Sequence, residues 1–327
     1  MQLVRLVKCA IWSLLVISAS VVAQQSPPVY PTRLIRIVAT HAPGSQADIL
    51  MRIVAEKMAA RLGQPVLVEN LPGAGGTIAA ARVAAAQADG YTLLLAANGH
   101  AINPALNDKL PFNTRAAFTG IGLIATVPSV IVGAPNGAVT LAEFVQRARR
   151  EPGRLSYASN GIGSASHLAA ELFRARADIT LLHVPYKSSS DAITDIVGGR
   201  VDFCIAPLGA AVPIIKQGKV QALAVTTRER APSLPHVPTL AEAGIAGFEF
   251  DFWYALFAPA NTPPGVRERL AHELGHALAL PDTRERFAAQ TAVPSALALE
   301  RFDAFFYNEL KRYAELVTLS NVRATLH

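Results

Sequence analysis

The sequence predicts an α/β protein of two lobes joined by a hinge. Strand-like apolar runs alternate with helix-like runs, an order that predicts parallel sheets with helices on both faces. The chain has 327 residues, 51% of them hydrophobic, which exceeds what one core usually holds. It leaves the first lobe near 126–130 and returns near 249–254, and two such crossings form a hinge. The predicted lobes are therefore 24–127 with 251–327, and 128–250.

The first lobe opens with a strand–helix series. The predicted elements are strand 34–40, helix 49–62, strand 66–69, helix 77–86 and strand 92–96. A loop over 103–118 follows, and strand 129–133 then leads to helix 141–149. In parallel sheets of this kind, ligands bind beyond the carboxyl ends of the strands.

A second series begins after residue 150. Its elements are strand 155–158, helix 165–175, strand 180–184, helix 190–197, strand 203–206, helix 211–217 and strand 222–226. Strand 252–258 follows the second crossing, and the helices 266–279, 283–289 and 298–317 complete the chain.

The N-terminus is typical of a secretory signal peptide. Arg5 and Lys8 precede a short apolar stretch, and small residues end it at Ala23. We expect 1–23 to be removed after export, with an uncleaved anchor as the alternative. Removal lowers the formal charge from +6 to +4, a mildly basic surface that does not indicate nucleic-acid binding. Cys204 then stands without a partner for a disulfide, and no later segment approaches the length of a membrane span, which predicts a soluble mature protein.

Two strand–turn–helix junctions carry the pattern of an anion site. One is the glycine-serine turn over 160–168, and the other is the turn over 41–48. Free backbone N–H groups at the positive end of a helix dipole bind anions, although a tight turn with a helix cap gives the same local sequence. The glycine-serine turn lacks the third glycine of a dinucleotide site. A structural turn into the next helix is a sufficient explanation for Gly73, Gly75 and Gly76.

The order of several motifs resembles the Bug family, the periplasmic substrate-binding receptors of tripartite tricarboxylate transporters. The motifs are YPTRLIR at 30–36, VENLPGAGG at 68–76, DGYTLL at 89–94, YAS at 157–159 before the glycine-serine turn, HVPYK at 183–187 and PTLAEAG at 238–244. The resemblance implies a type II periplasmic binding-protein fold that captures a small carboxylate between its lobes. It also implies tripartite tricarboxylate transporter membrane subunits as possible partners, with a monomeric receptor and no catalytic activity, cofactor or metal.

The resemblance places the ligand in two loops, 43–48 and 159–167, where neutral donors hold a carboxylate. Asn98 and Tyr186 follow strand ends and are expected to line the same cleft. The full set of expected binding residues is Pro43, Gly44, Ser45, Gln46, Ala47, Asp48, Asn98, Ser159, Gly161, Gly163, Ser164, Ser166, His167 and Tyr186.

The first loop departs from the family pattern of two glycines, a small hydroxyl and an aspartate. This chain has Gln46 and Ala47 there, so we expect Gln46 to influence which ligand binds. Asp48 is expected to cap the helix from residue 49. Asp191 is a second departure, for which a helix cap and a contact with a ligand amine are the two interpretations.

Three other side chains have two interpretations each. His167 either donates to a carboxylate or is fixed by the carbonyls of its own turn. Trp253 and Tyr254, at the second crossing, either form a wall of the ligand site or pack the hinge.

The segment His272-Glu273-Leu274-Gly275-His276 matches the zinc-protease pattern H-E-x-x-H, with Glu300 as a conceivable third ligand. A zinc-dependent hydrolase is therefore the alternative function. The apolar stripe of this helix passes through Leu270 and Leu274, about 200° from the two histidines, which predicts that they face solvent.

Overall fold

The computed structural model describes residues 30–320, so the predicted signal peptide, 1–23, lies outside the described residues. Arg33 begins the compact unit that contains both sheets. Within the described range, no helix is both long enough and apolar enough to cross a membrane.

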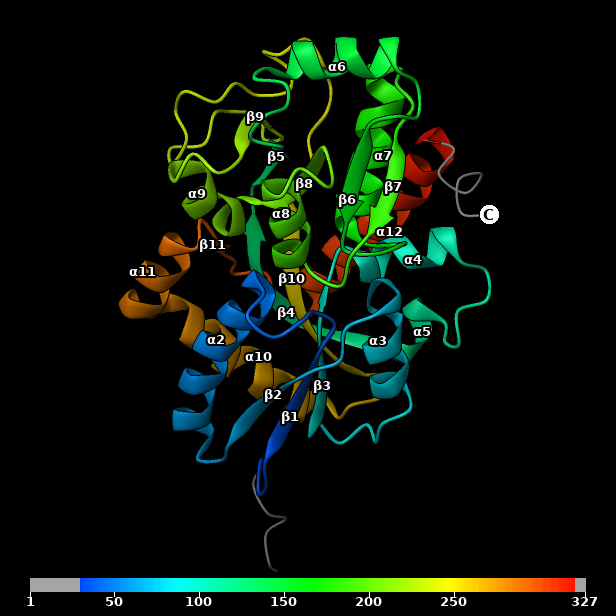
Figure 1. The fold of residues 1–327 in the computed structure, drawn as a ribbon. Coiled ribbons are helices and arrows are strands. Elements are labelled where there is room, and N and C mark those ends of the chain that lie inside the picture. The colour runs from blue at the N-terminus through cyan, green and yellow to red at the C-terminus, as the bar shows by residue number, and fades with distance from the viewer. Residues whose placement is uncertain (1–29, 321–327) are drawn as a thin grey trace, which may run out of the picture. The chain divides into compact units, whose positions relative to one another are not determined.

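The first sheet has the strand order β11-β4-β10-β3-β1-β2 (Figure 1). Its strands are β1 (Ile35–Ala39), β2 (Val66–Asn70), β3 (Thr92–Ala97), β4 (Phe118–Val127), β10 (Phe252–Pro259) and β11 (Val293–Pro294). Strand β1 pairs in parallel with β2 and β3, and Ile37 lies opposite Val68 and Leu93. In contrast, β10 returns from the second crossing and pairs antiparallel with β3 and β4. The parallel arrangement predicted for β1, β2 and β3 is confirmed, and the antiparallel β4 and β10 make the whole sheet mixed.

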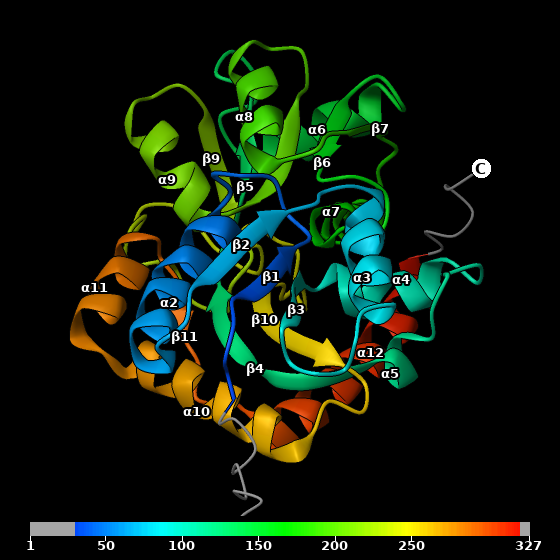
Figure 2. The same cartoon turned by 90° about the horizontal axis from the view of Figure 1, so that it is seen from below.

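Helices cover both faces of this sheet (Figure 2). They are α2 (Gln46–Leu62), the 3-10 turn η1 (Ala74–Gly76), α3 (Thr77–Ala84), α4 (Gly99–Leu106), α5 (Thr114–Ala117), α10 (Pro264–Ala279), α11 (Pro281–Ala289) and α12 (Leu299–Ser320). Helix α10 packs beside α2, and α12 packs beside α4. The predicted loop 103–118 in fact contains the end of α4 and all of α5.

Strand β4 is the one long strand of the first sheet that the sequence analysis did not predict. Glycine normally weakens a strand, and β4 contains Gly120 and Gly122. A Cβ at Gly120 would stand 2.4 Å from the Phe302 ring, and one at Gly122 would stand 3.0 Å from Leu274. The glycines are therefore needed for close packing of α12 and α10 on this strand.

The second sheet has the order β7-β6-β8-β5-β9. Its strands are β5 (Ser129–Gly133), β6 (Ser156–Ser159), β7 (Leu182–Pro185), β8 (Phe203–Pro207) and β9 (Gln221–Val225). Its helices are α6 (Leu141–Arg150), α7 (Ala165–Ala177), α8 (Ser189–Val197) and α9 (Leu208–Lys216). Strand β6 is parallel to β7 and β8, whereas β5 is antiparallel to β8 and β9.

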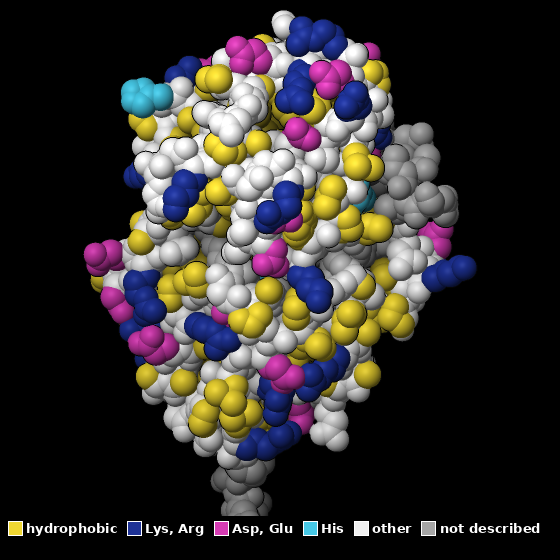
Figure 3. Space-filling model, viewed as in Figure 1, with side chains coloured by type: hydrophobic (Ala, Val, Ile, Leu, Met, Phe, Trp, Pro, Cys, Tyr) yellow, Lys and Arg dark blue, Asp and Glu magenta, His cyan; other side chains and the backbone are white. Residues whose placement is uncertain are grey.

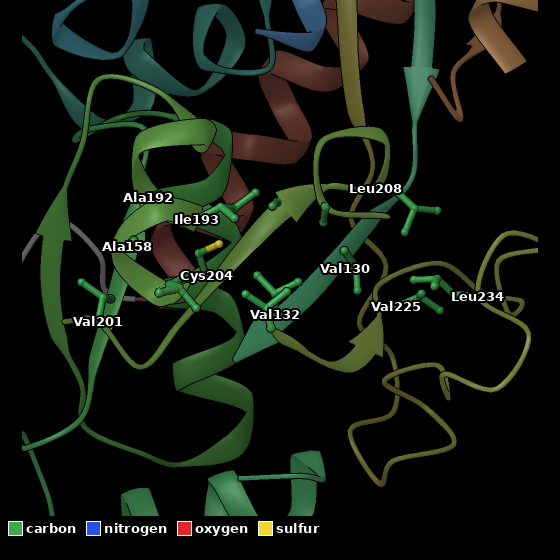
Figure 4. Packing of buried hydrophobic residues seen from close by; sticks show 14 of the residues in the cluster. Val130, Val132, Ala158, Ala192, Ile193, Val201, Cys204, Leu208, Val225 and Leu234 are labelled. Carbon is green, nitrogen blue, oxygen red and sulfur yellow. The ribbon is translucent and has the colours of Figure 1, made fainter. Parts of the chain in front are cut away.

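A continuous apolar cluster holds the second sheet to its helices. Val132 of β5, Cys204 of β8 and Ile193 of α8 belong to it (Figure 4). Cys204 is a free cysteine, and burial raises the pKa of its thiol to about 12. It is thus part of the core, with low reactivity as a thiolate.

The two crossing segments between the sheets are bound to each other. One runs from β4 to β5 through Pro128, and the other runs from β9 to β10. Thr226 donates its N–H to the Ser129 carbonyl over 3.0 Å, and the Ser129 hydroxyl donates to the Phe250 carbonyl over 2.9 Å. The crossings therefore form one hydrogen-bonded pair, as a hinge of two neighbouring segments requires.

Two glycines provide a matched test of this packing. Gly275 lies in α10 with nothing within 4 Å of an added Cβ. We expect Gly275→Ala to raise the free energy of unfolding by about 0.5–1 kcal/mol, because alanine favours a helix. Gly120→Ala should lower it by more than about 1 kcal/mol, because the methyl group collides with Phe302. Urea unfolding of both variants measures this, and equal effects of the two would contradict the packing described for β4.

Candidate ligand-binding site

A cavity of about 830 Å³ is lined by residues from loops at the edges of both sheets. Residues of the first lobe include Ser45, Gly75 and His100, and residues of the second include Gly161 and Gly209. The cavity therefore lies between the two sets of strand ends that the fold directs toward each other.

Helix N-termini form much of the cavity wall. Each helix concerned follows a strand of a parallel set, so the carboxyl ends of those strands bring the helix starts to the same edge. The helices are α2, α3, α4, α7, α8 and α9, and the lining residues at their starts are Ser45, Thr77, Gly99, Ser164, Ser188 and Gly209. Each start carries about half a positive elementary charge from the helix dipole, so the wall favours an anion.

Three of these helices are capped by serines on the wall. In α2, the Ser45 hydroxyl accepts the Asp48 N–H over 3.4 Å. In α7, the Ser164 hydroxyl accepts the His167 N–H over 3.2 Å. In α8, the Ser188 hydroxyl accepts the Asp191 N–H over 3.1 Å. Helix geometry leaves the two N–H groups before each capped one without an intrahelical partner. These backbone donors include those of Gln46, Ala165 and Ser189, residues that line the cavity.

The glycine-serine turn uses many of its own polar groups to hold its shape. The Asn160 N–H donates to Ser166 Oγ over 2.9 Å, and the Gly161 N–H donates to Ser159 Oγ over 3.1 Å. The Gly163 N–H is directed to His167 Nδ1 at 3.4 Å. Gly161 and Ser164 line the cavity, whereas Ser159, Gly163, Ser166 and His167 are buried behind it. For these four, the structure shows a supporting position and no contact with the cavity.

The turn over 41–48 has a similar division of roles. Gly44, Ser45 and Gln46 line the cavity, and Pro43, Ala47 and Asp48 do not. Helix α2 begins at Gln46 with Ser45 as its cap, so the expected cap by Asp48 was wrong. Asp48 instead accepts the Gly44 N–H over 2.9 Å and bonds from Asn70 and Arg52 over 2.8 and 3.0 Å. Burial alone would raise the pKa of Asp48, but these hydrogen bonds outweigh it and hold the pKa below its usual value.

Asn98 has a structural position outside the cavity lining. Its side chain is fully buried, donates to the Asp251 carbonyl and to Tyr313 Oη, and accepts the Trp253 N–H. Asn98 therefore ties β3 to the second crossing.

Tyr186 does line the cavity, and its hydroxyl donates to Asp195 over 2.7 Å. Tyr254 lines the cavity as well, whereas the Trp253 indole packs inside and donates to Glu309 over 2.9 Å.

Glycines at the walls allow backbone segments of the two lobes to touch. A Cβ at Gly75 would stand 2.6 Å from the Ile162 carbonyl oxygen, and one at Gly163 would stand 2.0 Å from Asn103 Oδ1. Asn103 also donates to the Gly75 carbonyl over 2.9 Å. Gly75 and Gly76 were expected to form a structural turn, and both also line the cavity.

A second contact between the lobes lies at the start of α9. A Cβ at Gly209 would stand 2.1 Å from the Gln290 carbonyl oxygen and 2.4 Å from Gln46 Nε2. The Gln46 amide donates to that same carbonyl, which fixes its orientation. Gly209 therefore lets the start of α9 lie directly against Gln46 and Gln290 of the first lobe.

The charge on the cavity wall comes from few side chains. Its only lining residues with a formal charge, within the described part of the chain, are Lys187 and Asp191. Burial lowers the pKa of His100 to about 3, and burial together with His183 lowers that of His167 to about 4, so both are neutral at pH 7. On the outer face in Figure 3, basic and acidic side chains are interspersed.

The H-E-x-x-H segment lies on α10, away from the cavity lining. The His272 side chain is 67% exposed, as predicted, and His276 is half-buried. Glu273 is fully buried and pairs with Arg61 and, over 3.3 Å, with Arg269. Glu300 is exposed and faces Arg267 at 3.6 Å. Among residues 30–320, no group of metal-ligating side chains is placed to hold an ion.

Several lining residues were missed by sequence analysis. They include Gly99, His100, Asn103, Thr114, Gly209 and Gln290. Gly99 and Gly209 follow the carboxyl ends of β3 and β8, so the strand-end rule applied to every junction identifies them. Thr114 and Gln290 have no such signal, because tertiary packing alone brings their segments to the cavity.

This fold and cavity define a two-lobed solute-binding protein. Residues 50–322 match the model of the tripartite tricarboxylate transporter family receptor, and the chain belongs to this family. The resemblance to Bug receptors and the two-lobed fold predicted from the sequence are thereby confirmed.

The relatives match along nearly their whole length. The chain is 39% identical to the UPF0065 protein in the tcbD-tcbE intergenic region of Pseudomonas sp. (strain P51) over 290 residues, 88% of this chain and 86% of the relative. It is 34% identical to the periplasmic binding protein BugD, with a TM-score of 0.85 over 90% of this chain and 99% of BugD. It is 32% identical to MatC of Rhodopseudomonas palustris with bound malate, with a TM-score of 0.84 over 88% of this chain and 100% of MatC.

The Asp48 network predicts a pH-dependent contribution to stability. Asp48→Asn should lower the free energy of unfolding at pH 7 by about 1–3 kcal/mol, because a buried hydrogen-bonded carboxylate is lost. The pKa of Asp48 is lower in the folded state than in the unfolded chain, so its stabilisation is complete above the unfolded pKa of about 4 and is lost as pH falls through the folded pKa.

Urea unfolding of wild type and Asp48→Asn from pH 7 to pH 3 tests this contribution. The difference in free energy of unfolding between the wild type and Asp48→Asn should stay constant down to about pH 5 and shrink below about pH 4. Asp178→Asn is the control, because Asp178 is exposed in left-handed backbone that asparagine tolerates. A difference for Asp48→Asn that does not shrink in acid would contradict the network.

Proposed function

We propose that this chain is a periplasmic receptor that captures a small carboxylate in the cavity and presents the closed complex to a membrane partner. The observation that carries the proposal is the convergence of helix N-termini on one cavity. The ligand carboxylate accepts hydrogen bonds from first-turn N–H groups of α2 and α7 and from the hydroxyls of Ser45 and Ser164. Bound malate in the related MatC structure supports this ligand class.

The proposed site combines direct and supporting residues from the sequence prediction. Gly44, Ser45, Gln46, Gly161, Ser164 and Tyr186 form the wall. Asp48, Ser166 and His167 hold the two turns in the shape that exposes the donors. Their effect on binding is indirect, through the loop conformation.

We propose the lobe bounds 24–127 with 251–327, and 128–250, as in the sequence analysis. The strands of the first sheet fall inside the first set, and those of the second sheet fall inside the other. Closure then bends the paired crossings near Pro128 and between Phe250 and Phe252. A ligand drives closure because it binds both walls and favours the closed state.

Export with cleavage of 1–23, a monomeric receptor and delivery to tripartite transporter membrane subunits complete the proposal. The family match supports the transporter assignment. Comparison of the N-terminal residue in the cell extract and in the periplasmic fraction tests the cleavage.

Thermal unfolding with a panel of acids tests ligand capture. The panel contains dicarboxylates, tricarboxylates, amino acids and aromatic acids, and the control is the methyl ester of each acid. At about 100 times its Kd, a cognate carboxylate adds about 2.7 kcal/mol and raises the Tm by roughly 5 °C or more. Its ester should give no shift, because the anion is lost. If no acid raises the Tm, the proposed function is wrong.

Gly209 tests closure independently of the ligand contacts. Gly209→Ala keeps a helical backbone at the start of α9, but its methyl group overlaps the Gln290 carbonyl when the lobes meet. We expect affinity for any carboxylate found above to fall by about tenfold or more, while the Tm without ligand changes little. Gly265→Ala is the control, because Gly265 has free space around it. Wild-type affinity in Gly209→Ala would show that closure does not need this contact.

A further inference from the structure

His183 is a half-buried ring on β7 that reaches the glycine-serine turn from outside the cavity. Strand β7 forms one edge of the second sheet and lies beside β6 (Figure 1). His183 is opposite Tyr157 in this parallel pair, and its Nε2 lies 2.6 Å from the Ser159 hydroxyl oxygen. His183 and Ser159 do not line the cavity, so any effect of this ring on a ligand passes through the turn.

The Ser159 hydroxyl links the His183 ring to the turn. This side chain is 1% exposed, and its oxygen accepts the Gly161 N–H over 3.1 Å. Within residues 30–320, His183 Nε2 is the remaining partner for the hydroxyl hydrogen. Burial lowers the pKa of His183, so the ring is neutral at pH 7. Because an unpaired buried hydroxyl is costly, Nε2 accepts that hydrogen and the ring carries its own proton on Nδ1.

Neighbouring rings fix the position of His183. The centroid of the Tyr157 ring lies 4.7 Å from that of His183, and the centroid of the His167 ring lies 4.5 Å from it, both in stacked geometry. The Tyr157 hydroxyl donates to Glu171 over 2.6 Å, and Glu171 pairs with Arg174 over 2.8 Å. Contacts from β6 and α7 therefore set where Nε2 points.

Gly161 depends on hydrogen bonds because packing does not hold it. Its φ is 98°, and a Cβ added there would meet nothing closer than the Tyr186 carbonyl oxygen at 3.8 Å. Glycine has a wide choice of backbone conformations, so loss of a hydrogen bond frees this residue more than it would free another. The Gly161 carbonyl accepts the N–H of Ser164, the cap of α7, over 3.1 Å. The position of Gly161 thus affects the cap and the first-turn donors of α7.

We propose that His183 is a positioning residue of the ligand site. It orients the Ser159 hydroxyl, which holds Gly161 and, through it, the Ser164 cap in the conformation that receives a ligand. This inference rests on the proposed function and adds to it a residue that does not touch the ligand.

Three substitutions separate the hydrogen bond of His183 from its ring. Phenylalanine keeps a ring in the stack and lacks the nitrogen. Glutamine carries its amide at the same number of bonds from Cβ as Nε2, so it can still bond to Ser159, whereas the asparagine amide is one bond too short. We expect His183→Phe and His183→Asn to bind an acid about threefold to tenfold more weakly than the wild type, and His183→Gln to restore affinity to within about twofold.

Calorimetric titration at pH 7 measures these affinities. The probes are succinate, citrate, aspartate and benzoate, one from each class of the panel above, together with any other panel acid that raises the wild-type Tm. His236→Phe is the matched control, because His236 is an exposed ring of the second lobe outside the cavity lining, and it should bind as the wild type does. The Tm without ligand shows that each variant is folded, and if His183→Phe does not fold, His183→Asn and His183→Gln make the same comparison.

A double-mutant cycle tests whether His183 acts through Ser159. Ser159→Ala should weaken binding, and adding His183→Phe to it should change affinity by less than about twofold, because the hydroxyl that His183 orients is already absent. Independent, multiplying losses would contradict the inference.

Amide hydrogen exchange provides a measurement without ligand. The Gly161 N–H should exchange at least about threefold faster in His183→Phe than in the wild type, and His183→Gln should slow it again. The Gly153 N–H, which donates to the Thr180 carbonyl over 3.0 Å, is the control and should not change.

Unchanged affinity in His183→Phe, with or without faster exchange at Gly161, would overturn the inference and leave the proposed function intact. A loss of affinity that His183→Gln does not restore would also overturn it, because the ring and not its nitrogen would then be responsible. If no acid of the panel binds the wild type, the proposed function fails, and this inference fails with it.

Discussion

The strands of the two parallel sets end at edges that face each other, and the helix that follows each strand must begin there. Peptide dipoles of α2, α3, α4, α7, α8 and α9 consequently add at one cavity. The preference for an anion needs no arginine in the wall. This preference follows from the direction of the strands and helices and does not depend on which side chains they carry.

Close approach of the walls depends on residues without side chains. Gly75 and Gly163 meet on one side of the cavity with Asn103 between them, and Gly209 meets Gln46 and Gln290 at α9. Each contact joins a segment of the first sheet to one of the second. The hydrogen-bonded crossings at Ser129 and Thr226 join the two sheets, and Phe252, at the end of the second crossing, also lines the cavity.

Alternation of apolar runs predicted most of the helices and strands, because each lobe repeats a strand–helix unit whose pattern is local. It failed at α4, at α5 and at β4, where Gly120 and Gly122 are required by helices that lie far along the chain. For the candidate site too, predictions succeeded where the signal was local and failed where it was not. Gly44, Ser45 and Ser164 were identifiable from their junctions, whereas Asn98 was misplaced because its partner Tyr313 lies 215 residues further on. Whether a polar side chain faces a cavity or a buried partner is decided by tertiary contacts that local sequence does not contain.

The origin of the anion preference in the backbone also affects how the family can diversify. A binding site that depends on one arginine loses its ligand class when that residue mutates. Here the dipoles persist through almost any substitution that leaves the helices folded, so positions such as Gln46 and Asp191 are free to change. Relatives at 32–39% identity that share the fold can therefore acquire different acids as ligands by single steps, each starting from a receptor that still attracts carboxylates. The ability to change ligand while still binding an acid therefore comes from the direction of the strands.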